Sequence, residues 1–129
     1  EEFPDLKLAL IEGGYTWLPW FIWRIDNEWK ALRSQAPWLD QPPSEYIYDH
    51  VRFTTQPSHM PDDPDDLKQL MEIIDAEKLL MFSSDYPHWD GDSPDHALPP
   101  SLSKEKKERI YYKNAQAFYN LPDDPSDLG

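Results

Sequence analysis

Three apolar segments, each followed by a loop and an amphipathic helical pattern, limit most strongly what this chain can fold into. Strands are predicted at residues 6–11, 50–56 and 79–84. Apolar, β-branched and aromatic side chains are typical of such strands, and glycine, proline or aspartate stands just past the end of each one. Successive strand–helix units favour a parallel sheet, either in a doubly wound α/β fold or in a (β/α) barrel.

Helix signals follow all three strands. The first helix begins near Thr16, a predicted N-cap, and carries apolar side chains at three- and four-residue spacing up to Leu32. The second begins after Asp63, a capping aspartate that precedes a proline. The third is predicted over about residues 104–119, with Ser103 as its cap. Each helix is therefore expected to bury one face against the sheet.

The remaining residues are predicted as loops and a tail. A proline-rich loop covers residues 36–44, and residues 122–129 are acidic, lack periodicity and are expected to form a flexible tail. A complete barrel usually takes about 250 residues. Three units within 129 residues would therefore form an arc, and its outer strands would need partners.

The composition argues against several classes of partner. The formal net charge of -13 would repel nucleic acid and anionic membranes, and no basic stripe interrupts it. No stretch approaches the roughly 18 apolar residues of a membrane span, and no signal peptide is visible, so a cytoplasmic protein is expected. The chain contains no cysteine, which excludes disulfides and thiolate metal ligands.

Potential metal ligands follow the third strand. Asp85 comes directly after it, and His88 stands three residues later. Because α/β barrels place their chemistry at the carboxyl ends of strands, we predict Asp85 as a site residue. Glu12 has the same placement after the first strand, before two glycines. The alternatives are that Asp85 is a turn or capping aspartate, that Glu12 is a solvated turn residue or pairs with an arginine such as Arg52, and that His88 only packs the loop.

Four stretches of the chain resemble one known family. They are Ile-Glu-Gly-Gly at residues 11–14 with Trp17, Arg-Phe-Thr-Thr-Gln-Pro at 52–57, Phe-Ser-Ser-Asp-Tyr-Pro-His at 82–88, and Arg-Ile-Tyr-Tyr-Lys-Asn-Ala at 109–115. Together they resemble the C-terminal part of the amidohydrolase-related metal-dependent hydrolases, in the branch that contains aminocarboxymuconate semialdehyde decarboxylase. The resemblance implies that residues 1–121 supply strands six, seven and eight of a (β/α)8 TIM-type barrel.

The resemblance also implies a divalent metal, either zinc or, alternatively, manganese or iron. Asp85 would bind this metal at the tip of the last strand and handle a proton during the reaction. His88 would reach the same pocket, as a further ligand or to orient a substrate. The family's remaining ligands, a His-x-His on the first strand and a histidine on the fifth, have no matching positions here. The isolated chain is therefore expected to be inactive.

Glu12 departs from the family pattern, which commonly has a histidine at the end of strand six. A glutamate there would act as a general base, or would bind a second metal ion together with Asp85. Trp17 and Trp89 follow strands six and eight. They would form walls of the pocket and favour an apolar or aromatic substrate.

Three functions remain open at this point. The first is a part in a metal-dependent hydrolase or non-oxidative decarboxylase that acts on a small carboxylate-bearing compound, aromatic if the tryptophans line the pocket. The second is a two-metal oxidative enzyme of the same fold, with iron or manganese. The third is a non-catalytic subunit or degenerate fragment that serves as an interaction module. In each case the unpaired strand edges predict a complementary N-terminal polypeptide or a homo-oligomer as partner.

Overall fold

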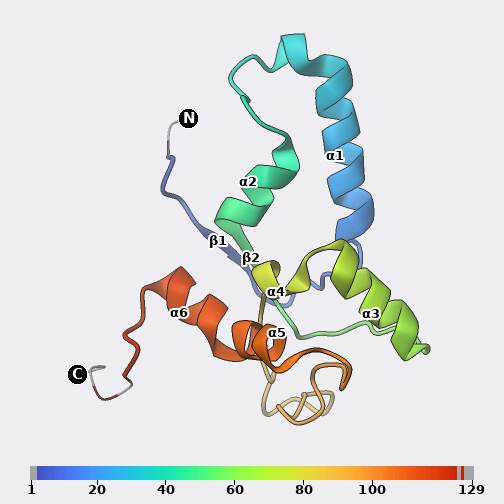
Figure 1. The fold of residues 1–129 in the computed structure, drawn as a ribbon, viewed down its shortest axis with the longest axis vertical. Coiled ribbons are helices and arrows are strands. Elements are labelled where there is room, and N and C mark those ends of the chain that lie inside the picture. Colours follow the sequence, from blue (N-terminus) through green and yellow to red (C-terminus); the bar gives the residue numbers. More distant parts are fainter. Residues whose placement is uncertain (1–2, 125, 127–129) are drawn as a thin grey trace.

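The computed structural model describes residues 3–124 and 126, which form helices around one small sheet (Figure 1). The strands β1 (Leu8–Leu10), β2 (Val51–Thr54) and β3 (Leu80–Met81) run parallel in that order. Phe53 at the centre pairs with Leu10 on one side and with Leu80 on the other. The predicted α/β class with a parallel sheet is confirmed, although each strand is shorter than its predicted segment.

The helices include all three that the sequence predicts. They are α1 (Leu18–Leu32), α2 (Pro43–His50), α3 (Pro64–Ile73), α4 (Ala76–Leu79), α5 (Lys104–Glu108) and α6 (Asn114–Tyr119). A short 3₁₀ turn (Arg33–Gln35) follows α1, and a π-helical turn (Arg109–Lys113) joins α5 to α6. Among the described helices, none combines the length and the apolar character that crossing a bilayer requires.

Two of the three predicted helix caps are present. The Asp63 carboxylate and the Ser103 hydroxyl each accept a hydrogen bond from an amide of their own helix, at 2.9 and 3.3 Å. The prediction that Thr16 caps α1 is wrong. The N-cap is Trp17, whose backbone is already helical (φ -79°, ψ -14°) and whose side chain makes no capping bond. An oxygen at position 16 therefore comes one residue too early to cap this helix.

Helix α2 begins inside the predicted proline-rich loop, residues 36–44, so that prediction is wrong at its C-terminal end. Pro43 occupies the first turn, where the missing N–H costs nothing. The carboxylate of Asp26 in α1 accepts hydrogen bonds from the amide (3.0 Å) and the hydroxyl (2.7 Å) of Ser44. The two helices consequently lie side by side, and the bond that starts α2 comes from a distant part of the chain (Figure 1).

The core joins the sheet to the helices. Its buried side chains include Phe53 and Leu80 from the strands and Leu18, Met71, Leu79 and Ile110 from the helices. The side-chain amide of Asn114 donates to the carbonyls of Glu77 (2.9 Å) and Leu80 (2.7 Å), which fixes α6 to α4 and β3. Within the described part of the chain, β1 and β3 each pair only with β2. The predicted tail, residues 122–129, lies partly outside the described residues.

Candidate functional site

Buried hydroxyl groups connect the carboxyl ends of the three strands. Thr54, the last residue of β2, accepts a hydrogen bond from the Glu12 amide through its Oγ1 (3.1 Å). Thr55 reaches the segment after β3, because its Oγ1 donates to the Ser83 carbonyl (3.2 Å) and accepts from the Ser83 amide (3.0 Å). The loops that follow β1, β2 and β3 therefore share one end of the sheet, as parallel strands require.

Asp85 lies at this end with only 16% of its side chain exposed. Its Oδ2 is 3.0 Å from Nδ1 of His88. One potential ligand atom from each of Asp85, His88 and Asp90 lies within 4.8 Å of the other two, and we call these three residues the Asp85 cluster. The structure thus brings together two residues selected from the sequence and adds Asp90, which was not selected.

Residues 84–92 form a loop that closes on itself and so gathers the cluster. The Asp92 amide donates to the Ser84 carbonyl and joins the two ends of the loop (2.9 Å). Gly91 occupies the tightest point, because a Cβ there would lie 2.7 Å from the Ser84 carbonyl oxygen. The glycine directly after Asp90 is the sequence signal that could have indicated this closure.

The donors of the Asp85 cluster fit a divalent metal. Carboxylate oxygens and an imidazole nitrogen are ligands that zinc, manganese and iron accept. Donors on one ion lie about 2.1 Å from it, hence at most about 4.2 Å apart, a spacing that the cluster reaches with small movements. Beside it, Oδ2 of Asp92 is buried and has no hydrogen-bond partner within the part of the chain that the structure describes. Three protein donors also leave coordination positions open, as catalytic sites require.

Glu12 is exposed and stands outside the Asp85 cluster. Its backbone adopts φ +58°, and that of Asp85 adopts φ +55°. Residues other than glycine are strained in this left-handed region, although aspartate tolerates it better than most. Both carboxylates selected from the sequence therefore stand on unusual backbone just beyond a strand. The role of Glu12 as a base or second ligand stays a prediction.

A cavity of about 440 Å³ adjoins the cluster, and neither selected tryptophan lines it. Phe82, Tyr86 and His88 contribute to its lining. Trp17 packs edge-on against Phe53 and donates its Nε1–H to a backbone carbonyl at 3.0 Å. Trp89 is 96% exposed. The aromatic groups that face this cavity are therefore Phe82 and Tyr86, and the wall role of the two tryptophans stays a prediction.

Acidic and phenolic groups dominate the surroundings of the cluster. Tyr15 is buried, and this burial, assisted by the Asp92 carboxylate, raises the pKa of Tyr15 to about 12. The hydroxyl of Tyr111 donates to the Pro94 carbonyl. Burial also raises the pKa of Tyr111, together with the charges of Asp95 and Asp92. Both phenols stay protonated at neutral pH, so the fixed charge here is negative and favours a cation.

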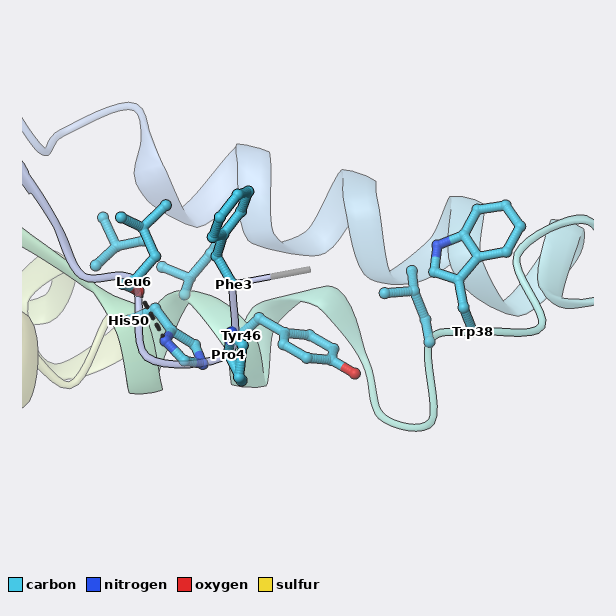
Figure 2. A pocket seen from close by; sticks show the side chains of 9 residues that line it. Phe3, Pro4, Leu6, Trp38, Tyr46 and His50 are labelled. Carbon is cyan, nitrogen blue, oxygen red and sulfur yellow. Dashed lines mark hydrogen bonds between the residues drawn. The ribbon is translucent and has the colours of Figure 1, made fainter. Parts of the chain in front are cut away.

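A second cavity, of about 520 Å³, lies beside the amino ends of β1 and β2 (Figure 2). We call it the apolar groove; the residues labelled in Figure 2 are Phe3, Pro4, Leu6, Trp38, Tyr46 and His50. Nδ1 of His50 lies 3.1 Å from the Leu6 carbonyl oxygen, which joins the segment before β1 to the end of α2. Among the described residues that line the groove, none carries a carboxylate, and most are apolar or aromatic.

Comparison with known proteins confirms the predicted family resemblance. A model of the amidohydrolase family matches residues 1–121, and no curated relative matches the chain. The structure resembles 5-carboxyvanillate decarboxylase from Sphingomonas paucimobilis, with 23% identity and a TM-score of 0.63 over 94% of this chain. It also resembles a dihydroxybenzoic acid decarboxylase from a Polaromonas species, solved with manganese and 2-nitroresorcinol, with 24% identity and a TM-score of 0.57 over 98% of this chain.

A third solved structure, 2,6-dihydroxybenzoate decarboxylase from Rhizobium, has 25% identity and a TM-score of 0.56 over 93% of this chain. The chain spans 36%, 37% and 36% of these three proteins, respectively. Its parallel sheet thus corresponds to a fragment of their fold. On the match to residues 1–121, the chain belongs to the amidohydrolase family.

Proposed function

We propose that the chain is the C-terminal part, strands six to eight, of a divalent-metal-dependent (β/α)8 enzyme that acts on a small aromatic carboxylate. Non-oxidative decarboxylation is the favoured reaction, with hydrolysis as the alternative within the same chemistry. The observation that carries the proposal is the Asp85 cluster, three metal donors just beyond β3. Support comes from the solved decarboxylases that the chain resembles, one of which holds manganese. The activity would be that of the complete protein, since this chain spans about a third of each relative.

The residues at the site suit a reaction in which a carbon–carboxylate bond breaks, carbon dioxide leaves and a proton takes its place. A divalent ion held by the cluster would supply Lewis-acid polarisation of a substrate oxygen. Asp85 would hold the proton and deliver it to the carbon, and His88, whose Nδ1 lies 3.0 Å from its Oδ2, would orient this carboxylate. Phe82 and Tyr86 would contact the aromatic ring.

Three further residues would act once the remaining strands complete the pocket. Glu12 would serve as an additional base beside the ion. Trp17 and Trp89 would close the wall around an aromatic substrate. Further metal ligands would come from outside these residues and occupy coordination positions that the three donors of the Asp85 cluster leave open.

Metal analysis and carbon dioxide release from hydroxybenzoates, both on the complete protein, test the proposal. One divalent ion per site and measurable release are expected. Asp85→Asn should lower kcat by about 100-fold or more, because it removes both a ligand and a proton carrier. Asp95→Asn is the matched control, since Asp95 is an exposed carboxylate that lies three residues beyond this loop and outside the cluster. Two redox-active ions per site would instead favour the oxidative alternative, and a complete protein that binds no metal would favour an interaction module.

The partner in this proposal is the rest of the barrel, as a separate N-terminal polypeptide or as part of one longer chain. Leu6 lies just before β1 and is 67% exposed, and Leu8 lies on β1 and is 52% exposed. Because parallel strands connect through right-handed crossovers, a strand preceding β1 would pair with its free edge. The helix between them would pack on the outer face, beside Leu6 and in the apolar groove.

The mass and composition of the purified protein test this partner. A species that contains an N-terminal section with a His-x-His motif is expected. A homo-oligomer of this chain alone would assign the groove to a second copy instead. A monodisperse, fully folded monomer of 129 residues would contradict the barrel arc.

A further inference from the structure

Gln56 connects the carboxyl ends of β2 and β3. It lies two residues beyond β2, and 3% of it is exposed. Its backbone amide donates to Oγ of Ser83 (3.1 Å), and its carbonyl accepts from Oγ1 of Thr54 (3.0 Å). Both backbone groups of Gln56 are therefore held by side chains at the ends of neighbouring strands.

The side chain of Gln56 extends this network to the Asp85 cluster. Its Nε2 donates to the carbonyl of Asp90 (3.3 Å), and its Oε1 accepts from the amide of Ser58 (3.1 Å). The carboxylate of Asp90 is one of the three donors of the cluster. Gln56 thus contacts the backbone of a candidate ligand without being one of the clustered donors.

The backbone around Asp90 needs such a contact because the side chains of the cluster do not fix it. Asp90 and His88 are exposed, and the nearest main-chain bond spans Asp90 from the Gly91 amide to the His88 carbonyl (3.1 Å). The bond from Asp92 to Ser84 closes the base of the loop. The Gln56 amide adds a second attachment that comes from a rigid, buried position outside the loop.

We propose that Gln56 is a positioning residue, which holds the Asp90 carbonyl so that the Asp90 carboxylate stays close to Asp85 and His88. This inference rests on the proposed metal site. An apolar side chain at position 56 would leave the Asp90 carbonyl without its donor, and the loop would sample arrangements in which the three donors are further apart. Part of the binding free energy of the ion would then be spent on gathering its ligands.

The experiment uses the complete protein and Mn²⁺ as the probe. Gln56→Met and Gln56→Leu place an apolar side chain of similar size in the buried position and remove both the donor to the Asp90 carbonyl and the acceptor of the Ser58 amide. Each is expected to weaken Mn²⁺ binding by about 10- to 100-fold, the usual effect of losing a partner that orients a ligand. Calorimetric titration, or the electron paramagnetic resonance signal of free Mn²⁺, measures this affinity below the unfolding temperature of every variant.

Ser44→Ala is the matched control, because it removes a buried hydroxyl that bonds Asp26 and lies outside the network of Gln56. It should lower the midpoint of thermal unfolding without a matching loss of Mn²⁺ affinity. Parental affinity in both folded Gln56 variants would overturn the role of Gln56. If the parent binds no Mn²⁺, the metal site itself fails. If Asp85→Asn abolishes binding that the Gln56 variants preserve, only the positioning role fails.

Discussion

Gly91 and Gly13 provide a matched pair of residues for testing how tightly the loop of the Asp85 cluster is packed. A Cβ at position 91 would lie 2.7 Å from the Ser84 carbonyl oxygen, whereas one at position 13 would lie 3.5 Å from Cβ of Leu10, an ordinary contact. The obstruction at Gly91 is backbone and cannot rotate away. Gly91→Ala should therefore cost about 1–3 kcal/mol of unfolding free energy and weaken Mn²⁺ binding. Gly13→Ala should do neither, and equal losses in urea unfolding would contradict this packing.

Tyr15 predicts a loss of stability at alkaline pH. Burial raises the pKa of Tyr15 from its ordinary 10.0 to about 12, so the folded state holds the phenolic proton more tightly than the unfolded state. This contribution is complete below pH 10 and is lost as the pH rises to about 12. This difference in the pKa of Tyr15 corresponds to about 3 kcal/mol of unfolding free energy.

Urea unfolding on either side of this pH window measures the effect of Tyr15. Tyr15→Phe cannot ionise, so its stability should decline less than that of the parent. Tyr48 and Tyr111, whose pKa values burial also raises, are present in both proteins and cancel in the comparison. Parallel pH curves for the two proteins would show that Tyr15 does not couple to folding.

At the scale of residues, the sequence pattern selects Asp85, which the structure places in the cluster, but it selects neither Asp90 nor Gln56. Asp85 follows an apolar run, and the end of such a run can be recognised locally. The position of Asp90 depends on a closed loop and on a bond from Gln56, which lies 34 positions away in the chain. The spacing of apolar residues along the sequence cannot indicate a hydrogen bond between two such distant positions.

At the scale of elements, helices α3 and α5 could be predicted because their caps lie within their own first turn. Strand β3 is an instructive difference, since the predicted strand continues to residue 84 but pairing with β2 ends at Met81. Beyond that point the Phe82 amide donates to the Ile110 carbonyl at the π-helical turn (2.9 Å). On the edge that faces β2, the Ser83 amide donates to Oγ1 of Thr55 (3.0 Å) rather than to a backbone carbonyl, so side-chain bonds replace the strand ladder beyond Met81.

Helix α2 escaped prediction because its cap comes from Asp26 in α1, and this contact can be tested. Asp26→Ala removes the acceptor of the Ser44 amide and hydroxyl, and Ser44 is buried. We expect a loss of about 2 kcal/mol in unfolding free energy. Glu28→Ala is the control, because Glu28 on the same helix forms an exposed pair with Arg24 and should contribute less than about 0.5 kcal/mol. Equal losses would mean that Asp26 does not hold α2.

At the scale of the whole molecule, the order of strands could be predicted because each strand–helix unit is local, but what covers the outer strands could not. β1 pairs with a neighbour on one side only among the described residues, and apolar side chains beside it are exposed. Charge does not favour a second copy on this surface, since each chain carries a formal net charge of -13. Both points favour the rest of the barrel as the covering partner.

Leu6 and Trp20 allow that partner to be detected from stability alone. They are equally exposed in this chain, at 67% and 66%, but Leu6 borders the apolar groove whereas Trp20 lies on α1. In the complete protein, Leu6→Asp should cost about 1.5–3 kcal/mol, because burial of this leucine beneath the preceding helix would be lost, and Trp20→Asp should not. Denaturant titration of the two variants of the complete protein measures the difference, and equal losses for Leu6→Asp and Trp20→Asp would mean that the groove stays open.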